Sequence, residues 1–355
     1  MSDIVIEKVS KSRFRKEDLE NPGFGVIFSD HMFSAEFKDG AWTDAKVMPF
    51  GNIEVSPALC SLHYGQAIFE GLKAFRAKDG RVSIFRPEKY HERMNRSAAR
   101  LCIPPVSYEL FLGGLTSVVN TDIAWVPDKK GHALYIRPFI FATENYLGVR
   151  VSSTYRFLII TSPVGAYYKE GINPVSLTTP GEYVRAVKGG LGSAKTPANY
   201  AASLLPADEA KKHGFTQVLW LDAIEHKYIE EVGTMNMFFY MGDELITPSL
   251  EGSVLAGVTR DSVMRIAKDW SIKVTERKIS IDEVIYASRQ GILKEAFGTG
   301  TAAVISPVGE IQHGKEHIVI NNRKIGALSQ RLYDEITGIQ YSEIPDRFNW
   351  CHTLG

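Results

Sequence analysis

A lysine follows a run of glycines near the middle of the chain, in segment 183–200 (Y-V-R-A-V-K-G-G-L-G-S-A-K-T-P-A-N-Y). Gly189, Gly190 and Gly192 allow backbone conformations and close approaches that a Cβ atom would prevent. Lys195 comes after them in the same stretch. A tight loop of this kind can hold a lysine in one position, where its amine could act as a covalent nucleophile.

Three familiar interpretations of a glycine-rich stretch can be tested on this segment. A P-loop needs glycine immediately before the lysine, but Ala194 stands there. A dinucleotide-binding fingerprint needs a third glycine where Lys195 stands, after a strand in an early βαβ unit. Both patterns fit poorly. The third is a lysine used as a covalent amine, and this segment alone does not separate it from a solvated lysine on a surface loop.

The composition is that of a soluble globular protein and gives no sign of a nucleic-acid or membrane partner. The chain has 355 residues, of which 44% are hydrophobic and 23% are charged, and this length predicts two domains. Lysine plus arginine equals aspartate plus glutamate, at 41 each, so no basic surface is indicated. No apolar run approaches the roughly 20 residues of a membrane span.

The three cysteines, Cys60, Cys102 and Cys351, are odd in number and widely spaced. This pattern indicates a reducing compartment, and neither a disulfide framework nor a zinc site. The opening residues M-S-D-I-V-I-E-K include acidic side chains and no apolar run, so we expect no signal peptide. We therefore expect a cytoplasmic protein without a metal site.

The N-terminal half is expected to contain several strands and two helices, the first opened by Pro87. Tyr135 and Arg137 fall on the same face of a predicted strand because side chains alternate along strands. One exposed face of an antiparallel sheet would explain them equally well. The expected strands are 23–30, 32–37, 81–86, 133–143 and 156–165, the first two meeting at a turn, and the expected helices are 87–101 and 107–120.

The C-terminal half repeats short strands and helices. Strands are expected at 216–222 and 235–241, helices at 258–270, 280–290 and 323–336, and a glycine/threonine loop leading into a strand at 297–308. Such a mixture with several hairpins predicts an α/β (or α+β-like) fold of two domains, and not one doubly wound sheet. The expected parts are a smaller N-terminal domain (1–165), an interdomain loop (166–174) and a larger C-terminal domain (175–355).

Several further features would suit an anionic, aromatic cofactor. The segment A-G-V-T-R (256–260) begins a predicted helix, and helix N-termini present N–H groups to phosphate. T-G-T-A-A (299–303) offers hydroxyl groups, and Arg93 could add a bidentate bond. Glu231, in an apolar context, needs a partner such as a protonated ring nitrogen. Each feature also has an ordinary explanation: a helix lead-in, a turn, a solvated arginine and a strand entry.

The motifs form one ordered set along the chain. They are Y-V-R-A-x-K-G-G-x-G-x-x-K-x-x-x-N-Y, E-V-G-T-M-N, G-V-T-R and F-G-T-G-T-A, preceded by V-M-P-F-G, L-H-Y-G-Q-A-I-F-E-G-L-K-A-F-R, R-M-N-R-S-A-A-R and L-Y-I-R-P, and followed by T-G-I-Q-Y. This set resembles the branched-chain amino-acid aminotransferases, which are fold-type IV enzymes using pyridoxal 5′-phosphate. The resemblance covers about residues 20–345 in the right order and is highly specific.

For the cofactor, the resemblance implies that Lys195 forms a Schiff base with pyridoxal phosphate and later moves the proton of the substrate Cα. Its free-amine pKa should then be lowered by burial and by nearby cations. Glu231 would pair with the pyridine nitrogen, and Tyr200 would hydrogen-bond the phenolic oxygen. The other implied contacts are Arg93, Val258, Thr259 and Thr301 around the phosphate and Leu255 against the ring.

For the substrates, the resemblance implies reversible transamination of L-leucine, L-isoleucine and L-valine with 2-oxoglutarate, giving branched-chain 2-oxo acids and L-glutamate. The backbone amides of Thr301 and Ala302, assisted by Tyr135, would bind the α-carboxylate. Arg137, with Tyr64 and Tyr167, would accept the γ-carboxylate of 2-oxoglutarate. The implied walls of the side-chain pocket are Phe24, Tyr64, Phe69, Val149 and Tyr167.

The resemblance further implies a homodimer, because in this family the loop containing Val149 reaches the pocket of the other subunit. The segment 166–174 would act as a mobile cover. One departure concerns the C-x-x-C motif of the mammalian members, whose positions are Ala303 and Ser306 here. A thiol-based redox switch is therefore not expected.

Two other classes of function stay open at this point. A D-amino-acid aminotransferase or an aminodeoxychorismate lyase on the same fold would keep Lys195 and Glu231 but change the pocket. The L-Y-I-R-P and L-H-Y-G-Q-A-I-F segments argue against both. A catalytically silent relative with a binding or regulatory role is disfavoured by the intact Lys195, Glu231, Arg93 and Tyr200.

Overall fold

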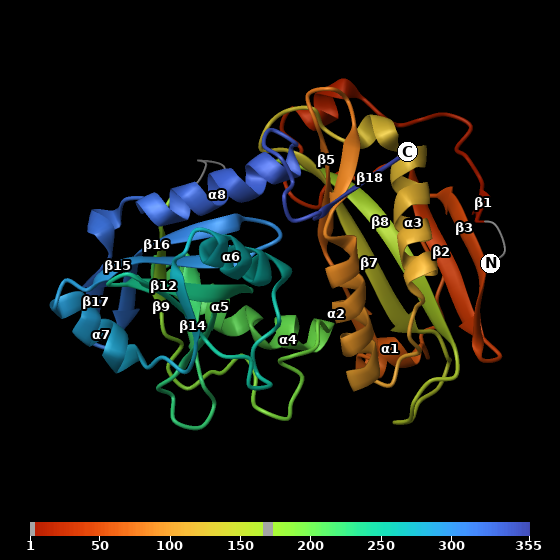
Figure 1. The fold of residues 1–355 in the computed structure, drawn as a ribbon. Helices are drawn as coiled ribbons and strands as arrows, with labels where there is room; N and C mark the ends of the chain where they lie inside the picture. Colours follow the sequence, from red (N-terminus) through yellow and green to blue (C-terminus); the bar gives the residue numbers. More distant parts are fainter. Residues whose placement is uncertain (1–3, 166–172) are drawn as a thin grey trace. The chain divides into compact units, whose positions relative to one another are not determined.

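The computed structural model describes residues 4–165 and 173–355, and its contacts divide the chain into two compact units (Figure 1). The sequence predicts one domain boundary near residue 165, whereas each of these two units combines separate segments of the chain. The first unit comprises Met1–Tyr167, Ala194–Pro197 and Gly338–Gly355, and the second comprises Tyr168–Ser193 and Ala198–Thr337. Lys195 thus belongs with the N-terminal residues, although the flanking chain belongs to the second unit. Most of the predicted loop 166–174 lies outside the described residues.

The first unit is built on one mainly antiparallel sheet with the strand order β1-β3-β2-β8-β7-β5-β6-β18, to which β4 adds by pairing with β7. Only the β1–β3 pair among the described strands of this sheet is parallel. The strands are β1 (Val5–Ile6), β2 (His31–Lys38), β3 (Ala41–Pro49), β4 (Ala67–Phe69), β5 (Leu72–Arg76), β6 (Val82–Phe85), β7 (Ala133–Ala142), β8 (Tyr155–Val164) and β18 (Cys351–Thr353).

Helices cover this sheet and bury its apolar side chains. Helix α3 packs on β2, β3 and β8, and α2 packs on α3 and β4 (Figure 1). Phe33, Phe111 and Phe157 from two strands and one helix meet in the core, where each is fully buried. The helices are α1 (Cys60–Tyr64), α2 (Pro87–Arg100) and α3 (Tyr108–Thr121), with short 3₁₀ turns η1 (Lys16–Leu19) and η2 (Ile123–Trp125).

Local sequence explains where these helices begin. Pro87 opens α2 at its first position, where the missing N–H would be unpaired in any case. Ser107 caps α3 by accepting a hydrogen bond of 3.1 Å from the backbone N–H of Leu110. Such caps stabilise a helix by about 1 kcal/mol.

The predicted strand at 23–30 is wrong, and with it the predicted hairpin to 32–37. Strand β2 instead pairs with β3 and β8. Gly23 and Gly25 have φ angles of 67° and 70°, which are incompatible with an extended strand. Asp30 is buried and accepts hydrogen bonds from Ser12 and from Trp125 Nε1, so it fixes the chain in an irregular path.

The second unit contains a closed ring of strands. The strand order is β11-β10-β9-β16-β15-β12-β13-β14, and an additional β11–β12 pairing closes the first six strands into a barrel, with β17 added on β16. The strands are β9 (Val175–Thr178), β10 (Gln217–Leu221), β11 (Ile229–Val232), β12 (Met235–Met241), β13 (Glu244–Thr247), β14 (Lys273–Glu276), β15 (Leu293–Gly300), β16 (Val304–His313) and β17 (Glu316–Val319).

The apolar core of this unit includes Leu177, Leu219, Met237, Phe239 and Ile311, each fully buried. Helix α5 packs on β10, α6 on β14 and β15, and α7 on β15 and β17. The helices are α4 (Pro197–Ala202), α5 (Leu204–Lys212), α6 (Val258–Asp269), α7 (Ile281–Arg289) and α8 (Ala327–Gln340), with the 3₁₀ turn η3 (Asn321–Arg323); the last residues of α8 belong to the first unit.

Most of the predicted elements are confirmed to within a few residues, but the segment 297–308 differs. Its F-G-T-G residues lie in strand β15 and not in a loop, and the chain turns only at 301–303. Pairing of Thr299 with Asn236 on β12 and with Ile305 on β16 holds these glycines in the sheet. No helix in the described parts of the chain combines the length and the apolar character needed to cross a bilayer.

Candidate active site

Hydrogen bonds of the Lys195 backbone fix this residue between a helix and a strand of the first unit. Its N–H donates to Ser97 Oγ on α2 at 2.9 Å, and its carbonyl accepts from the N–H of Phe69 on β4 at 3.1 Å. The next residue, Thr196, donates its hydroxyl to the carbonyl of Ala67 at 2.9 Å. Hydrogen bonds on both sides leave the lysine backbone little freedom, as a covalent amine requires.

The amine of Lys195 is unlike a surface lysine. Its Nζ lies 4.8 Å from the ring centroid of Phe69. Desolvation, followed by the charge of Arg93, lowers the pKa of Lys195 to about 8, although Glu70 opposes this effect. Part of the side chain is accessible at the surface, but the protein around the amine is dense enough to disfavour its charged form. The prediction of a lowered pKa is thus supported by the local structure.

A second lysine of this unit shares this property. Lys73, on β5, is buried and its pKa is lowered to about 8 by desolvation. The sequence analysis did not single it out, because nothing in its strand distinguishes it from a solvated lysine. The two lysines are distinguished by their positions, since only Lys195 lies in the glycine-rich segment.

Arg93 forms an ion pair that the sequence did not predict. Its Nε and Nη2 atoms donate to Oε1 and Oε2 of Glu70, each at 2.7 Å. Both side chains are buried, at 4% and 0% exposure. A guanidinium has five N–H donors, of which this pair uses two, and donors of this kind suit a phosphate. Glu70 stands in the F-E-G-L-K-A-F segment, which was the only signal available for it.

Tyr135 and Arg137 on β7 lie on the same face, as predicted. Arg137 Nη2 donates to the phenolic oxygen of Tyr135 at 2.9 Å, and its guanidinium lies 4.8 Å from the centroid of the Phe69 ring. The ring of Phe24 lies 5.1 Å from that of Tyr135. A Cβ atom at Gly71 would lie 2.0 Å from the Tyr135 hydroxyl, so Tyr135 can occupy this position only because residue 71 is glycine.

The other predicted pocket residues are Tyr64, Val149 and Tyr167. Tyr64 ends α1 with 45% of its surface exposed, and Val149 is 87% exposed in the loop between β7 and β8. An exposed valine gains free energy if a partner covers it. Tyr167 lies outside the described residues, so the structure does not describe its position.

In the second unit, Glu231 on β11 is buried and bound from two directions. The backbone N–H of Leu255 donates to its Oε1 at 2.7 Å, and Arg185 Nε lies 3.2 Å from its Oε2. The latter contact is an ion pair without hydrogen-bond geometry, and Arg185 Nε has no hydrogen-bond partner within the described residues. The small pocket at this point is lined by Arg185, Asn199, Tyr200, Ser203, Glu231, Gly233, Thr234 and Leu255.

Arg185 also explains how the glycine-rich segment is kept in shape. Its Nη2 donates to the carbonyl of Gly192 at 3.1 Å and to that of Ser253. Asn199 Nδ2 donates to the carbonyl of Leu191 at 2.9 Å. These bonds satisfy carbonyl groups that an irregular loop would otherwise leave without partners.

The start of α6 is the phosphate-binding candidate of the second unit. Its N-cap is Gly257, and the helix begins with Val258 and Thr259, at the end where N–H groups are presented to anions. A Cβ at Gly257 would lie 1.9 Å from Asn236 Oδ1, and Asn236 Nδ2 donates to the carbonyl of Leu255 at 2.8 Å. Thr301 and Ala302 lie in the turn between β15 and β16.

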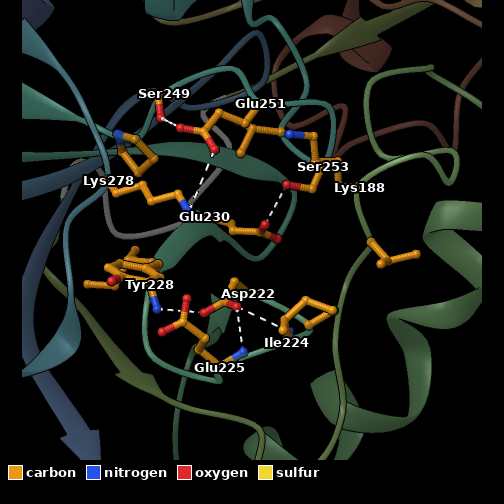
Figure 2. Close-up of a pocket in the computed structure, with 15 residues that line it drawn as sticks. Lys188, Asp222, Ile224, Glu225, Tyr228, Glu230, Ser249, Glu251, Ser253 and Lys278 are labelled. Carbon is orange, nitrogen blue, oxygen red and sulfur yellow. Dashed lines mark hydrogen bonds and ion pairs between the residues drawn. The ribbon is translucent and has the colours of Figure 1, made fainter.

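A larger pocket of the second unit surrounds Glu230, the neighbour of Glu231 on β11 (Figure 2). Ser253 Oγ donates to Glu230 Oε1, whereas Oε2 has no hydrogen-bond partner among the described residues. Burial raises the pKa of Glu230. None of the predicted site residues that the structure describes lines this pocket. Adjacent strand residues face opposite sides, so the two glutamates have different surroundings.

The residues of both units fit pyridoxal phosphate in chemistry. Its aldehyde requires a neutral amine, and Lys195 has a pKa of about 8. Its phosphate requires cationic or N–H donors, and Arg93 in the first unit and the start of α6 in the second unit are each groups of this kind. Its ring nitrogen requires a buried carboxylate, and Glu231 is one.

Comparisons with known proteins agree with this chemistry. Residues 67–311 match the family described as amino-transferase class IV. The chain is 52% identical over 344 residues to branched-chain-amino-acid aminotransferase 2 of Bacillus subtilis (strain 168), covering 97% of this chain and 95% of that protein. An identity this high over nearly the whole length of both chains shows common family membership.

Solved structures give the same result for the fold. The Escherichia coli branched-chain amino acid aminotransferase aligns with a TM-score of 0.76 at 26% identity, over 92% of this chain and 99% of that one. The branched-chain aminotransferase of the archaeon Thermoproteus uzoniensis, solved with norvaline, aligns with a TM-score of 0.75 at 25% identity, over 92% and 100%. The chain therefore belongs to the branched-chain-amino-acid aminotransferases, a family of pyridoxal-phosphate-dependent, fold-type IV (class IV) aminotransferases.

Proposed function

We propose that this enzyme exchanges amino groups between L-leucine, L-isoleucine or L-valine and 2-oxoglutarate, in both directions. The observation that carries the proposal is Lys195, whose backbone is held by Ser97 and Phe69 and whose amine has a pKa of about 8. A lysine with this pKa is about half neutral at pH 8, far more than an ordinary lysine with a pKa of about 10.4, so it can act both as a nucleophile and as a base.

Lys195 has two tasks in this proposal. When bound, pyridoxal phosphate supplies an aldehyde that bonds to amino groups and a ring that accepts electrons. Lys195 would hold that aldehyde through its amine and would move the proton at the substrate Cα. Glu231 keeps the ring nitrogen protonated, and Tyr200 donates a hydrogen bond to the phenolic oxygen.

The remaining cofactor contacts are assigned to residues that present donors or apolar surface. Arg93, the backbone amides at the start of α6 and the hydroxyl of Thr259 bind the phosphate, together with Thr301. These amides stand at the N-terminus of α6, whose N-cap is Gly257, and helix N-termini present N–H groups to anions. Leu255 packs against the ring, and its N–H orients Glu231.

The substrate pocket must accept two unlike side chains. Phe24 and Phe69 offer apolar surface for leucine, isoleucine and valine, which differ by at most one methylene, worth about 1–3 kcal/mol. Arg137, placed by its bond to Tyr135, binds the γ-carboxylate of 2-oxoglutarate. The backbone amides of Thr301 and Ala302 bind the α-carboxylate.

We further propose that the enzyme acts as a cytoplasmic homodimer. The exposure of Val149 supports a partner subunit that covers this residue. Tyr64, which is also exposed, and Tyr167 are assigned to the side-chain pocket of the substrate. The segment 166–174 is assigned as a cover, between a domain of residues 1–165 and a domain of residues 175–355. All three cysteines are free thiols, which is consistent with a reducing compartment.

The test is the visible absorption spectrum of the purified protein, recorded before and after adding L-leucine alone and then 2-oxoglutarate. We expect the band of the lysine-bound cofactor to fall with leucine and to return with the keto acid. A band that ignores leucine but responds to D-alanine would indicate a D-amino-acid aminotransferase instead. A response to aminodeoxychorismate with release of pyruvate would indicate a lyase.

A further inference from the structure

We propose that Glu70 is a positioning residue, which orients the guanidinium of Arg93 toward the cofactor phosphate and offsets positive charge beside Lys195. This inference rests on the proposed function, because it assigns the phosphate of pyridoxal phosphate to Arg93. No role for Glu70 follows from its sequence position alone. The assignment comes from its contacts in the first unit.

Glu70 is anchored where it stands. It lies between β4 and β5 with no exposed surface. Its N–H donates to the carbonyl of Pro138 at 2.7 Å, and its Oε2 also accepts from the N–H of Gly71 at 3.2 Å. The carboxylate is therefore fixed by the sheet, independently of helix α2, which carries Arg93.

The pairing fixes the direction of the whole Arg93 guanidinium. Glu70 takes the Nε and Nη2 edge through two hydrogen bonds of 2.7 Å. Because a guanidinium is planar and rigid, fixing two of its nitrogens also fixes the direction of Nη1. A bidentate pair thus works as a geometric constraint as well as a charge pair.

The same carboxylate balances charge around the lysine. Arg93 lowers the pKa of Lys195 and Glu70 raises it, so both lie close enough to act on the amine. Without Glu70, the buried cation Arg93 would lose the carboxylate that compensates its charge. Such a charge is strongly unfavourable unless its side chain moves, and a moved side chain would no longer face the phosphate.

The test compares two ligands that differ only in the phosphate. Equilibrium dissociation constants for pyridoxal 5′-phosphate and for pyridoxal are measured on the full-length apoprotein, for the wild type, Glu70→Gln and Arg93→Lys. We expect Glu70→Gln to weaken pyridoxal phosphate binding at least tenfold and pyridoxal binding less than threefold. The double variant that combines Glu70→Gln with Arg93→Lys should bind pyridoxal phosphate little more weakly than Arg93→Lys alone, since both changes act through one group.

Other outcomes would overturn the inference. Equal weakening of both ligands would mean that Glu70 acts only through general stability of the fold, and no change would mean that it does not position Arg93. If Glu70→Gln yields no folded protein, Glu70→Asp decides in its place. Its shorter side chain cannot maintain both 2.7 Å bonds from the same backbone, so the same selective loss is expected, and a uniform loss counts against the inference. A wild type that binds both ligands equally would instead overturn the proposed function.

Discussion

The backbone N–H of Leu255 donates a hydrogen bond of 2.7 Å to Oε1 of Glu231. This bond directly joins Leu255, which is assigned to pack against the cofactor ring, to Glu231, which is assigned to the ring nitrogen. Arg185 approaches the other oxygen of the same carboxylate at 3.2 Å. The two contacts hold this carboxylate in one position, as a partner for a ring nitrogen requires.

Glu231→Gln should lower the rate of transamination about ten- to a hundredfold, because a hydrogen bond to a charged group contributes about 1.5–3 kcal/mol. Glu230→Gln is the matched control, since it is the neighbouring buried glutamate and faces a different pocket (Figure 2). We expect it to remain within about threefold of the wild-type rate. Steady-state rates with leucine and 2-oxoglutarate measure both, and equal losses in the two variants would contradict the assignment.

Lys195→Ala should bind pyridoxal phosphate without a covalent bond and lose turnover by several powers of ten, since both the nucleophile and the base are removed. In the wild type, borohydride reduction of the bond between lysine and cofactor leaves the cofactor attached as a label, and peptide mapping should find this label on Lys195. Lys73 is the internal control, because its pKa is lowered to about 8 as well. A label on Lys73, or a nearly normal rate in Lys195→Ala, would refute the central assignment.

The pKa of Lys195 predicts how fast the apoprotein captures the cofactor at different pH values. The charged form of the lysine cannot attack the aldehyde, and a pKa lowered to about 8 means that the neutral fraction rises as the pH passes through 8. The stopped-flow rate of pyridoxal phosphate binding should rise over the same interval. The α-acetylated lysine amide is the control, as its rate should rise only near its ordinary pKa of about 10.4. Coincident profiles would show that the protein does not perturb the amine.

Gly71→Ala should impair substrate recognition while sparing the cofactor. The added Cβ would lie 2.0 Å from the Tyr135 hydroxyl, so the phenol must move away from Arg137. We expect KM for 2-oxoglutarate to rise about tenfold or more, from the loss of one bond to a charged group, with the dissociation constant of pyridoxal phosphate unchanged. Gly51→Ala is the control, because nothing lies within 4 Å of its Cβ position. An unchanged KM in Gly71→Ala would mean that Tyr135 and Arg137 do not bind this substrate.

Asp222 should stabilise the fold against acid. Although burial raises its pKa, the backbone N–H groups of Glu225, Tyr228, Lys227 and Ile224 together lower it to about 2. Because the folded-state pKa lies below the unfolded value of 3.8, this stabilisation is complete above about pH 4 and is lost as the pH falls toward 2.

Asp222→Ala should therefore lower the free energy of unfolding by about 1–2 kcal/mol at pH 7, allowing for the solvent exposure of the carboxylate. The difference from the wild type should shrink between pH 4 and pH 2. Urea unfolding of the apoprotein at several pH values measures this difference. Asp243→Ala is the control, since that side chain is 94% exposed and pairs with Lys294. A difference that does not depend on pH would exclude the ionised carboxylate as its cause.

The sequence alone determined the family and predicted the residues that carry its chemistry, because both predictions rest on short motifs whose residue types are dictated by the reaction. It also determined the long regular elements, since α2, α6, β7 and β12 have strong local periodicity or continuous apolar runs. Such signals need only neighbouring residues.

The tertiary structure decided what depends on distant parts of the chain. It assigned Lys195 to the first unit, paired Arg93 with Glu70, and showed that Gly71 makes room for Tyr135. It also removed the expected strand at 23–30, where buried Asp30 is held by Ser12 and Trp125. Each of these outcomes is a side-chain contact or a steric fit between residues remote in sequence, and a pattern of residue types contains no information about such distances.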